Sequence, residues 1–149
     1  RCPVILMHAR TADPRTMQQG IHYEDAAREV ARFLEGRVAA LEALGIPRAR
    51  IAVDPGIGFG KRVADNLGLV ARLPLLANLG CAMLVGASRK GFVGKVTGVA
   101  EAGRRVMGSV ALALAAAANG AQMVRVHDVA ATVQALRMDA ALRAGWEEA

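Results

Sequence analysis

Short apolar runs alternate with longer segments of helical periodicity along the whole chain. Each apolar run has the length and composition of a strand and leads directly into a polar or glycine-containing segment, as buried parallel strands commonly do. The runs are Val4 to Met7, Ile51 to Val53, Ala82 to Val85 and Met123 to Val126. The pattern predicts four strands, with polar groups gathered at their carboxyl ends.

The segments between and after these runs predict helices. The expected helices are Tyr23 to Leu44, Asn66 to Leu79 with an interruption at Pro74, Ala100 to Asn119, and a last helix that ends at Leu142. Gly45 and Pro47 are end signals for the first, whose apolar stripe comprises Ala26, Val30, Phe33, Leu34 and Leu41. The segment from Gly91 to Gly103 is expected to be a glycine-rich loop.

The last helix carries its own boundary signals. We expect Asp128 to cap its amino end and Gly145 to terminate it. Its apolar positions, expected to face inward, are Val129, Val133, Leu136 and Ala140.

The repeated β-α order predicts an α/β protein with parallel strands and right-handed crossovers. Four such units form either a small open sheet or half of a (β/α)8 TIM barrel. The apolar character of all four strands, and a start at Arg1 only two residues before a strand, favour half a barrel. No linker or low-complexity segment divides the chain, so residues 1–149 are expected to form part of a single domain with no internal boundary.

Composition narrows the class of protein further. A hydrophobic content of 54% excludes a disordered chain, and the net charge of +6 comes from 19 basic and 13 acidic residues that are scattered rather than clustered. Aromatic residues make up 3% and are not interleaved with the basic ones, which argues against a nucleic-acid surface. The longest apolar stretch, Val110 to Ala118, is too short to span a membrane. Cys2 and Cys81 lie in apolar contexts, which favours buried reduced thiols and a cytoplasmic protein.

The segment from Asp54 to Lys61 has glycine at every second position from Gly56 to Gly60. Its spacing fits neither a Walker phosphate loop nor a dinucleotide fingerprint. Two interpretations stay open: a tight turn, or a backbone that approaches a flat ligand closely with Phe59 as a wall. Asp54, at the strand end, either caps the next helix or accepts paired N–H donors from a planar heterocycle.

Two other strand ends carry groups suited to anions. Ser88, Arg89 and Lys90 form either an anion or carbonyl clamp or a solvated basic loop. Arg125 and His127 lie on one side of an alternating strand, where they would hold a phosphate or form a core pair.

His8 and Arg10 share the spacing of the Arg125 and His127 pair, with a structural role equally open. Spacing typical of a catalytic nucleophile or a metal site is absent from the sequence.

Taken together, these motifs resemble the carboxyl-terminal half of dihydropteroate synthases, the folate-biosynthesis enzymes that sulfonamides inhibit. The residues that carry the resemblance are Met7-His8 with Pro14, Thr16, Met17 and Gln18; Asp54 to Lys61; Leu84 to Gly86 with Ser88 to Lys90 and Phe92 to Gly94; and Val124 to Val129. The loop from Ala9 to Asp13 departs from the family pattern.

The resemblance implies a TIM barrel of which this chain supplies strands five to eight. The family condenses 4-aminobenzoate with 6-hydroxymethyl-7,8-dihydropterin diphosphate to give 7,8-dihydropteroate and pyrophosphate. It uses Mg²⁺, whose ligand is expected in the missing amino-terminal half, and it commonly forms homodimers. The chain alone is therefore expected to be inactive. Non-catalytic alternatives are a pterin-binding or scaffolding paralogue and, less favoured, a nucleic-acid-binding domain.

The resemblance also assigns roles to individual residues. Lys90, Arg125 and His127 are the expected catalytic residues, with Arg125 and His127 on the diphosphate. The expected substrate-binding residues are Asp54 on the pterin ring, Phe59, Gly86 and Met7 around it, Lys90 between pterin and aminobenzoate, and Ser88 on the aminobenzoate carboxylate.

Overall fold

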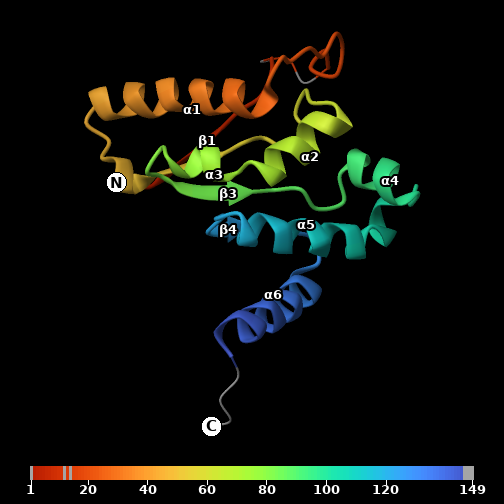
Figure 1. The fold of residues 1–149 in the computed structure, drawn as a ribbon. Coiled ribbons are helices and arrows are strands. Elements are labelled where there is room, and N and C mark those ends of the chain that lie inside the picture. Colours follow the sequence, from red (N-terminus) through yellow and green to blue (C-terminus); the bar gives the residue numbers. More distant parts are fainter. Residues whose placement is uncertain (1, 12, 14, 146–149) are drawn as a thin grey trace.

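The computed structural model describes residues 2–11, 13 and 15–145, so that Arg1 and Pro14 of the sequence patterns lie outside the described residues. Four parallel strands form one sheet in the order β1-β2-β3-β4 (Figure 1). Their bounds are Val4–Met7 for β1, Ile51–Asp54 for β2, Ala82–Val85 for β3 and Met123–Val124 for β4. The predicted α/β class with parallel strands is confirmed, and β4 is shorter than expected.

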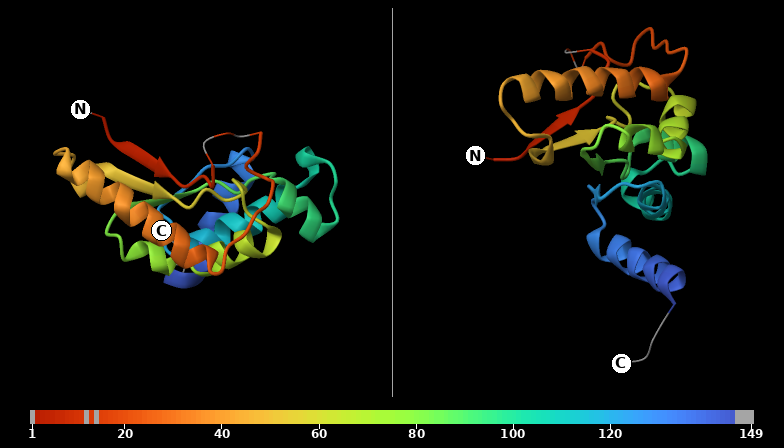
Figure 2. Two further views of the ribbon diagram at one scale, coloured as in Figure 1. Left: turned by 90° about the horizontal axis from the view of Figure 1, so that it is seen from above. Right: turned by 60° about the vertical axis from the view of Figure 1, so that its left-hand side comes forward.

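Helices follow each strand. They are α1 (Ala26–Ala43), α2 (Val63–Ala71), α3 (Pro74–Ala77), α4 (Gly91–Thr97), α5 (Val106–Ala118) and α6 (Val129–Ala144), with short 3-10 turns at Arg48–Arg50 and Ala102–Arg104. Seen from above, α1, α2 and α3 lie on one side of the strands (Figure 2, left). One face of the sheet is therefore packed against helices, and α1, α2 and α3 do not cover the opposite face.

Alternation along the strands separates these two faces. The residues packed into the core are Val4 and Leu6 of β1, Ile51 and Val53 of β2, Met83 and Val85 of β3, and Val124 of β4. The intervening positions point the other way, and in β1 they are exposed, with Ile5 at 56% and Met7 at 39%. Met7 lies opposite Asp54 in the β1–β2 register, so both belong to the face away from the core.

Helix α1 packs its buried side chains against this core. Asp25 caps its amino end by accepting the Arg28 N–H at 3.1 Å. Its buried positions are Ala26, Ala27, Val30, Leu34 and Val38. The predicted stripe was wrong at Phe33, which is exposed and packs edge-on against His8.

The interruption at Pro74 is confirmed, because α2 ends before it and α3 begins with it. The predicted loop from Gly91 to Gly103 was wrong, since α4 begins directly after Lys90. A Cβ atom on Gly94 would lie 2.5 Å from the Val99 carbonyl oxygen. This glycine therefore permits close packing within a helix, and glycine content alone does not separate that use from a flexible loop.

Helix α6 ends before Gly145 as predicted, but its expected inward face is wrong for this structure. Val129 is 60% exposed, Val133 is also exposed, and Thr132 is the buried residue of the helix. In Figure 1, α6 lies at the end of the helix array, beyond α5, and no described element covers its far side. Among the described residues, no helix is long and apolar enough to cross a membrane.

The predicted burial of the two cysteines is wrong for Cys2, which is exposed. Cys81 is partly buried, and both are free thiols.

Candidate active site

Asp54 ends β2 and is only 5% exposed. Within the described residues its carboxylate accepts one hydrogen bond, from the Gly56 N–H to Oδ1 at 2.7 Å. Helix α2 begins nine residues later and is capped by Arg62, so the helix-cap alternative for Asp54 is wrong. Burial raises the pKa of this carboxyl, while Gly56, Lys90, Arg125 and Lys61 oppose the rise. The group is a buried acceptor with unused hydrogen-bonding capacity.

The glycines of the loop after Asp54 allow neighbouring residues of the protein to pack closely against the loop. A Cβ on Gly56 would lie 1.8 Å from the His8 carbonyl oxygen, and one on Gly58 would lie 2.8 Å from Cδ of Lys90. Gly56, Gly58 and Gly60 all have positive φ, which a residue with a side chain rarely adopts. The tight turn is confirmed, and neighbouring residues fill the space that glycine leaves; the close approach of a flat ligand, with Phe59 as a wall, stays a prediction.

Lys90 spans the gap between the loops after β2 and β3. Its ammonium lies 4.2 Å from the centre of the Phe59 ring and donates a hydrogen bond to the Ile57 carbonyl. Burial lowers the pKa of this amine to about 8, with the charge of Arg125 acting in the same direction and that of Asp54 opposing both. Lys90 is therefore near the point of losing its proton at mildly alkaline pH.

A cavity of about 290 Å³ opens at the carboxyl ends of β3 and β4. It brings together most of the sequence-predicted site, and its lining residues are Gly86, Ser88, Lys90, Arg125, Val126 and His127. Arg125 and His127 lie beyond the end of β4, so they are not in an alternating strand as predicted. The Arg125 N–H nevertheless donates to the Val85 carbonyl oxygen at 2.9 Å, which extends the ladder and points both residues at the cavity.

Ser88 is buried, and its hydroxyl is already engaged by His127. The His127 backbone N–H donates to Ser88 Oγ at 3.2 Å, and Nδ1 of the same histidine lies 3.0 Å from Oγ. When the hydroxyl donates its proton to Nδ1, the proton of the neutral imidazole is left on Nε2. Ser88 thus orients a histidine that can donate a hydrogen bond to an anion.

Arg89, left open between an anion clamp and a solvated basic loop, is not among the residues that line this cavity. Its guanidinium forms two contacts with the Asp128 carboxylate, one of them at 3.0 Å from Nε, so Asp128 does not cap α6 with its side chain. Arg89 also has a positive φ of 59°. The Arg89 N–H donates to Ser109 Oγ at 2.9 Å, and Arg105 Nη1 donates to its carbonyl. These contacts of Arg89 fix the turn on which Ser88 and Lys90 lie.

Sequence reasoning missed Ser109 and Arg105, which lie 20 and 16 residues after Arg89. Neither belongs to a local motif, so no signal in the sequence could have found them.

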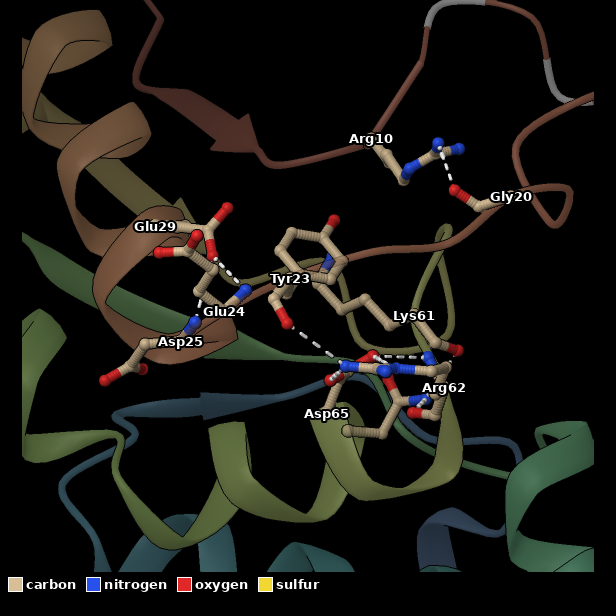
Figure 3. A network of polar contacts seen from close by, with 10 residues as sticks. Arg10, Gly20, Tyr23, Glu24, Asp25, Glu29, Lys61, Arg62 and Asp65 are labelled. Atoms are coloured by element: carbon tan, nitrogen blue, oxygen red, sulfur yellow. Dashed lines mark hydrogen bonds and ion pairs between the residues drawn. The ribbon is translucent and has the colours of Figure 1, made fainter.

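The start of α2 is tied to the segment before α1. Arg62 pairs with Asp65 and donates to the Tyr23 carbonyl at 3.3 Å, as Figure 3 shows. Arg10, left open between a site and a structural role, donates to the carbonyls of Gln19 and Gly20 (Figure 3). Both arginines hold loops in place at this end of the sheet.

A divalent metal would need oxygen ligands that the described part of the chain does not gather. Within residues 2–11, 13 and 15–145, no three His, Cys, Asp or Glu side chains cluster closely enough to hold an ion. The cavity is lined instead by the cations Lys90 and Arg125, which would repel a metal. The residues present do not fit a Mg²⁺ site of their own.

A family model described as pterin binding enzyme matches residues 1–127, which include every residue of this site. The chain belongs to the pterin binding enzyme family. A solved structure has the same fold in the matched region. The dihydropteroate synthase of Xanthomonas albilineans, in complex with 7,8-dihydropteroate, is 48% identical to this chain and superposes on it with a TM-score of 0.87. The match covers 95% of this chain and 51% of that one.

Two further relatives agree. The dihydropteroate synthase of Neisseria meningitidis serogroup B is 49% identical over 93% of this chain and 50% of its own length. The Stenotrophomonas maltophilia dihydropteroate synthase structure is 44% identical with a TM-score of 0.92, covering 97% of this chain and 54% of that one. The chain spans about half the length of the family members that it matches, and its sheet corresponds to about half of their barrel.

Proposed function

We propose that this chain forms one half of the active site of a dihydropteroate synthase. The reaction joins 4-aminobenzoate to 6-hydroxymethyl-7,8-dihydropterin diphosphate and releases pyrophosphate. The observation that carries the proposal is one cavity lined by Lys90, Arg125 and His127, with the buried acceptor Asp54 close enough to Lys90 and Arg125 to feel their charges. The relative from Xanthomonas albilineans binds 7,8-dihydropteroate, the product of this reaction.

The pterin ring belongs at the β2 end of the site. An amino-pyrimidinone edge presents parallel N–H donors, and a buried carboxylate such as Asp54 accepts them in a low-dielectric setting. Gly86 leaves space beside the Arg125 guanidinium, because a Cβ there would lie 3.4 Å from Nε. Met7, on the same face of the sheet as Asp54, supplies an apolar contact.

The diphosphate belongs at the β4 end. Arg125 supplies a planar fork of donors, and His127 supplies Nε2–H when Nδ1 accepts from Ser88. As the C–O bond to the diphosphate breaks, the electron pair leaves on the phosphate oxygen, where these donors stabilise it. The aminobenzoate nitrogen forms the new C–N bond and releases a proton. Catalysis then needs no protein nucleophile.

Lys90 would serve both substrates from its place over Phe59. Its ammonium lies against the aromatic face, so it can contact the pterin and the aminobenzoate while the Phe59 ring lines the pterin pocket. Ser88 remains the proposed contact for the aminobenzoate carboxylate, although its hydroxyl also holds His127.

Mg²⁺ would pair with diphosphate oxygens, and its protein ligands would come from the part of the barrel that this chain does not include. We likewise propose that residues 1–149 are part of a single barrel domain and that activity requires the complete barrel. A homodimer and a cytoplasmic location complete the proposal, and the mass of the complete protein in solution tests the dimer.

Lys90 gives the direct test in a full-length protein that carries this chain. Because Lys90 acts as a cation and its pKa is about 8, kcat/KM for condensation should fall as pH rises through 8. Lys90→Arg should move this fall to higher pH, and Lys90→Ala should abolish product formation. Near-normal turnover in Lys90→Ala would refute the proposal, and the non-catalytic pterin-binding paralogue would then be tested by pterin binding alone.

A further inference from the structure

Lys61 ends the glycine loop, and the proposed chemistry gives it no task. Its side chain is 4% exposed. The ammonium contacts three acceptors: Nδ1 of His8 at 2.9 Å, the carbonyl oxygen of Gly56 at 2.9 Å and that of Phe59 at 3.1 Å. An ammonium has three N–H donors, so this one is fully used inside the protein.

None of these acceptors is an acid. Among the residues that the structure describes, Lys61 forms no ion pair within 4 Å, although the charge of Asp54 acts on it from farther away. Burial lowers the pKa of the amine to about 8. Burying a cation without a paired anion is costly, and an apolar side chain of similar length would avoid that cost. What Lys61 provides and an apolar side chain would not is a set of hydrogen bonds that connects three acceptors from two loops.

His8 is the acceptor that comes from the other loop, after β1. Its Nδ1 faces the ammonium and so acts as acceptor, which places the ring proton on Nε2. Phe33 packs edge-on against the ring with the centres 4.9 Å apart, which fixes its orientation. Burial, followed by the Lys61 charge, lowers the pKa of His8 to about 4, so the ring stays neutral at neutral pH. The histidine is a rigid, uncharged acceptor.

The two carbonyls that Lys61 binds flank the substrate-binding part of the loop. Gly56 is the residue whose N–H donates to Asp54, and Phe59 is the residue whose ring lies over Lys90. Gly56 also lies against the His8 backbone, where no Cβ could fit. The ammonium therefore links Gly56, which hydrogen-bonds to Asp54, with Phe59 at the other end of the segment.

We propose that Lys61 is a positioning residue, which holds the loop from Gly56 to Phe59 against His8 and thereby sets the places of Asp54 and Phe59 for substrate. The inference rests on the proposed function for the identity of the substrates. The contact with His8 can be tested without them.

The first experiment is Lys61→Met in a full-length protein that carries this chain, because methionine keeps the length and loses all three donors. We expect the KM values for the pterin diphosphate and for 4-aminobenzoate to rise about 10-fold, since the groups that meet them are displaced. A merely structural role would lower the active fraction, and hence the apparent kcat, with KM unchanged. Unchanged KM values would overturn the proposal.

The second experiment changes only the acceptor and serves if Lys61→Met fails to fold. His8→Asn places an amide oxygen near the position of Nδ1, whereas His8→Leu fills similar space with no acceptor. We expect KM within about 2-fold of the unmodified protein for His8→Asn and an increase like that of Lys61→Met for His8→Leu. Equal effects of the two variants would show that His8 only packs, and the proposal would fall.

Arg104→Met is the control for the loss of a positive charge in Lys61→Met, because Arg104 is exposed and lies outside the site.

A third readout needs no substrate. In protein labelled with ¹⁵N histidine, the signal lost in His8→Asn identifies His8, and we expect its Nδ1 to be unprotonated and its Nε2 protonated. A protonated Nδ1 at neutral pH would overturn the inference. If the unmodified protein made no dihydropteroate, the proposed function would fail while this spectrum still judged the contact.

Discussion

The two ends of the candidate site are held in different ways. At the β2 end, Asp54 is buried and its loop is fixed by backbone contacts and by Lys61. At the β4 end, Arg125 and His127 are exposed; the Ser88 hydroxyl positions His127, and the Arg125 backbone N–H donates to the Val85 carbonyl. A planar ring is recognised by an acceptor whose direction must be set in advance, whereas a diphosphate is met by the long, adjustable side chain of Arg125 beside His127. The difference predicts unequal responses to mutation and to salt.

The largest effect should come from the buried end. Asp54→Asn removes the charge and turns one acceptor oxygen into a donor, which opposes the ring N–H groups. We expect a loss of about 100-fold in kcat/KM, because a hydrogen bond to a charged group contributes about 1.5–3 kcal/mol. Steady-state kinetics at several salt concentrations should show little change in this factor, since a buried group is poorly screened. A loss that fades with salt would contradict the contrast between the two ends.

A smaller effect is expected at the exposed end. Arg125→Gln should raise KM for the pterin diphosphate about 10-fold at low salt, and this factor should shrink as ionic strength rises, because exposed charges are screened within about 10 Å at 0.1 M. KM for 4-aminobenzoate should change little and serves as the internal control. A salt-independent loss equal to that of Asp54→Asn would remove the distinction between the ends.

The smallest effect should come from the ion pair that joins the segments after β3 and β4. Arg89→Gly keeps the positive φ and removes the side chain whose guanidinium pairs with Asp128. We expect about a 3-fold loss in kcat/KM, because the pair is partly exposed and such ion pairs contribute little. Asp128→Asn should cost a similar factor, and the double variant should cost no more than either alone. Additive losses would show that the two residues act independently.

Much of the site could be predicted because its residues sit at strand ends. The order of apolar runs placed Asp54 and Ser88 after two different strands and Arg125 near the end of a third, and parallel strands bring their carboxyl ends to one edge. Local sequence also located helix ends at Pro74 and Gly145, where backbone geometry depends on the residue itself. The roles of these residues toward substrate remain predictions.

What failed depended on partners distant in the sequence. Arg89 was left open between an anion clamp and a solvated basic loop, whereas Asp128, 39 residues later, pairs with it. The glycines around Gly94 suggested a loop because the close approach of Val99 is invisible in the pattern. Long side chains reach several positions, and only the fold decides which one is near.

Periodicity by itself determined that the chain forms parallel strands linked by helices, since a period of two or of 3.6 residues follows from backbone geometry. The tertiary structure decided which apolar faces are covered: α1 buries Leu34, whereas α6, with an equally apolar set of residues, leaves Val129 exposed. It also decided that Lys61 points inward to His8 rather than to a ligand. Burial and hydrogen bonding are properties of pairs of segments, and a single segment does not specify its neighbour.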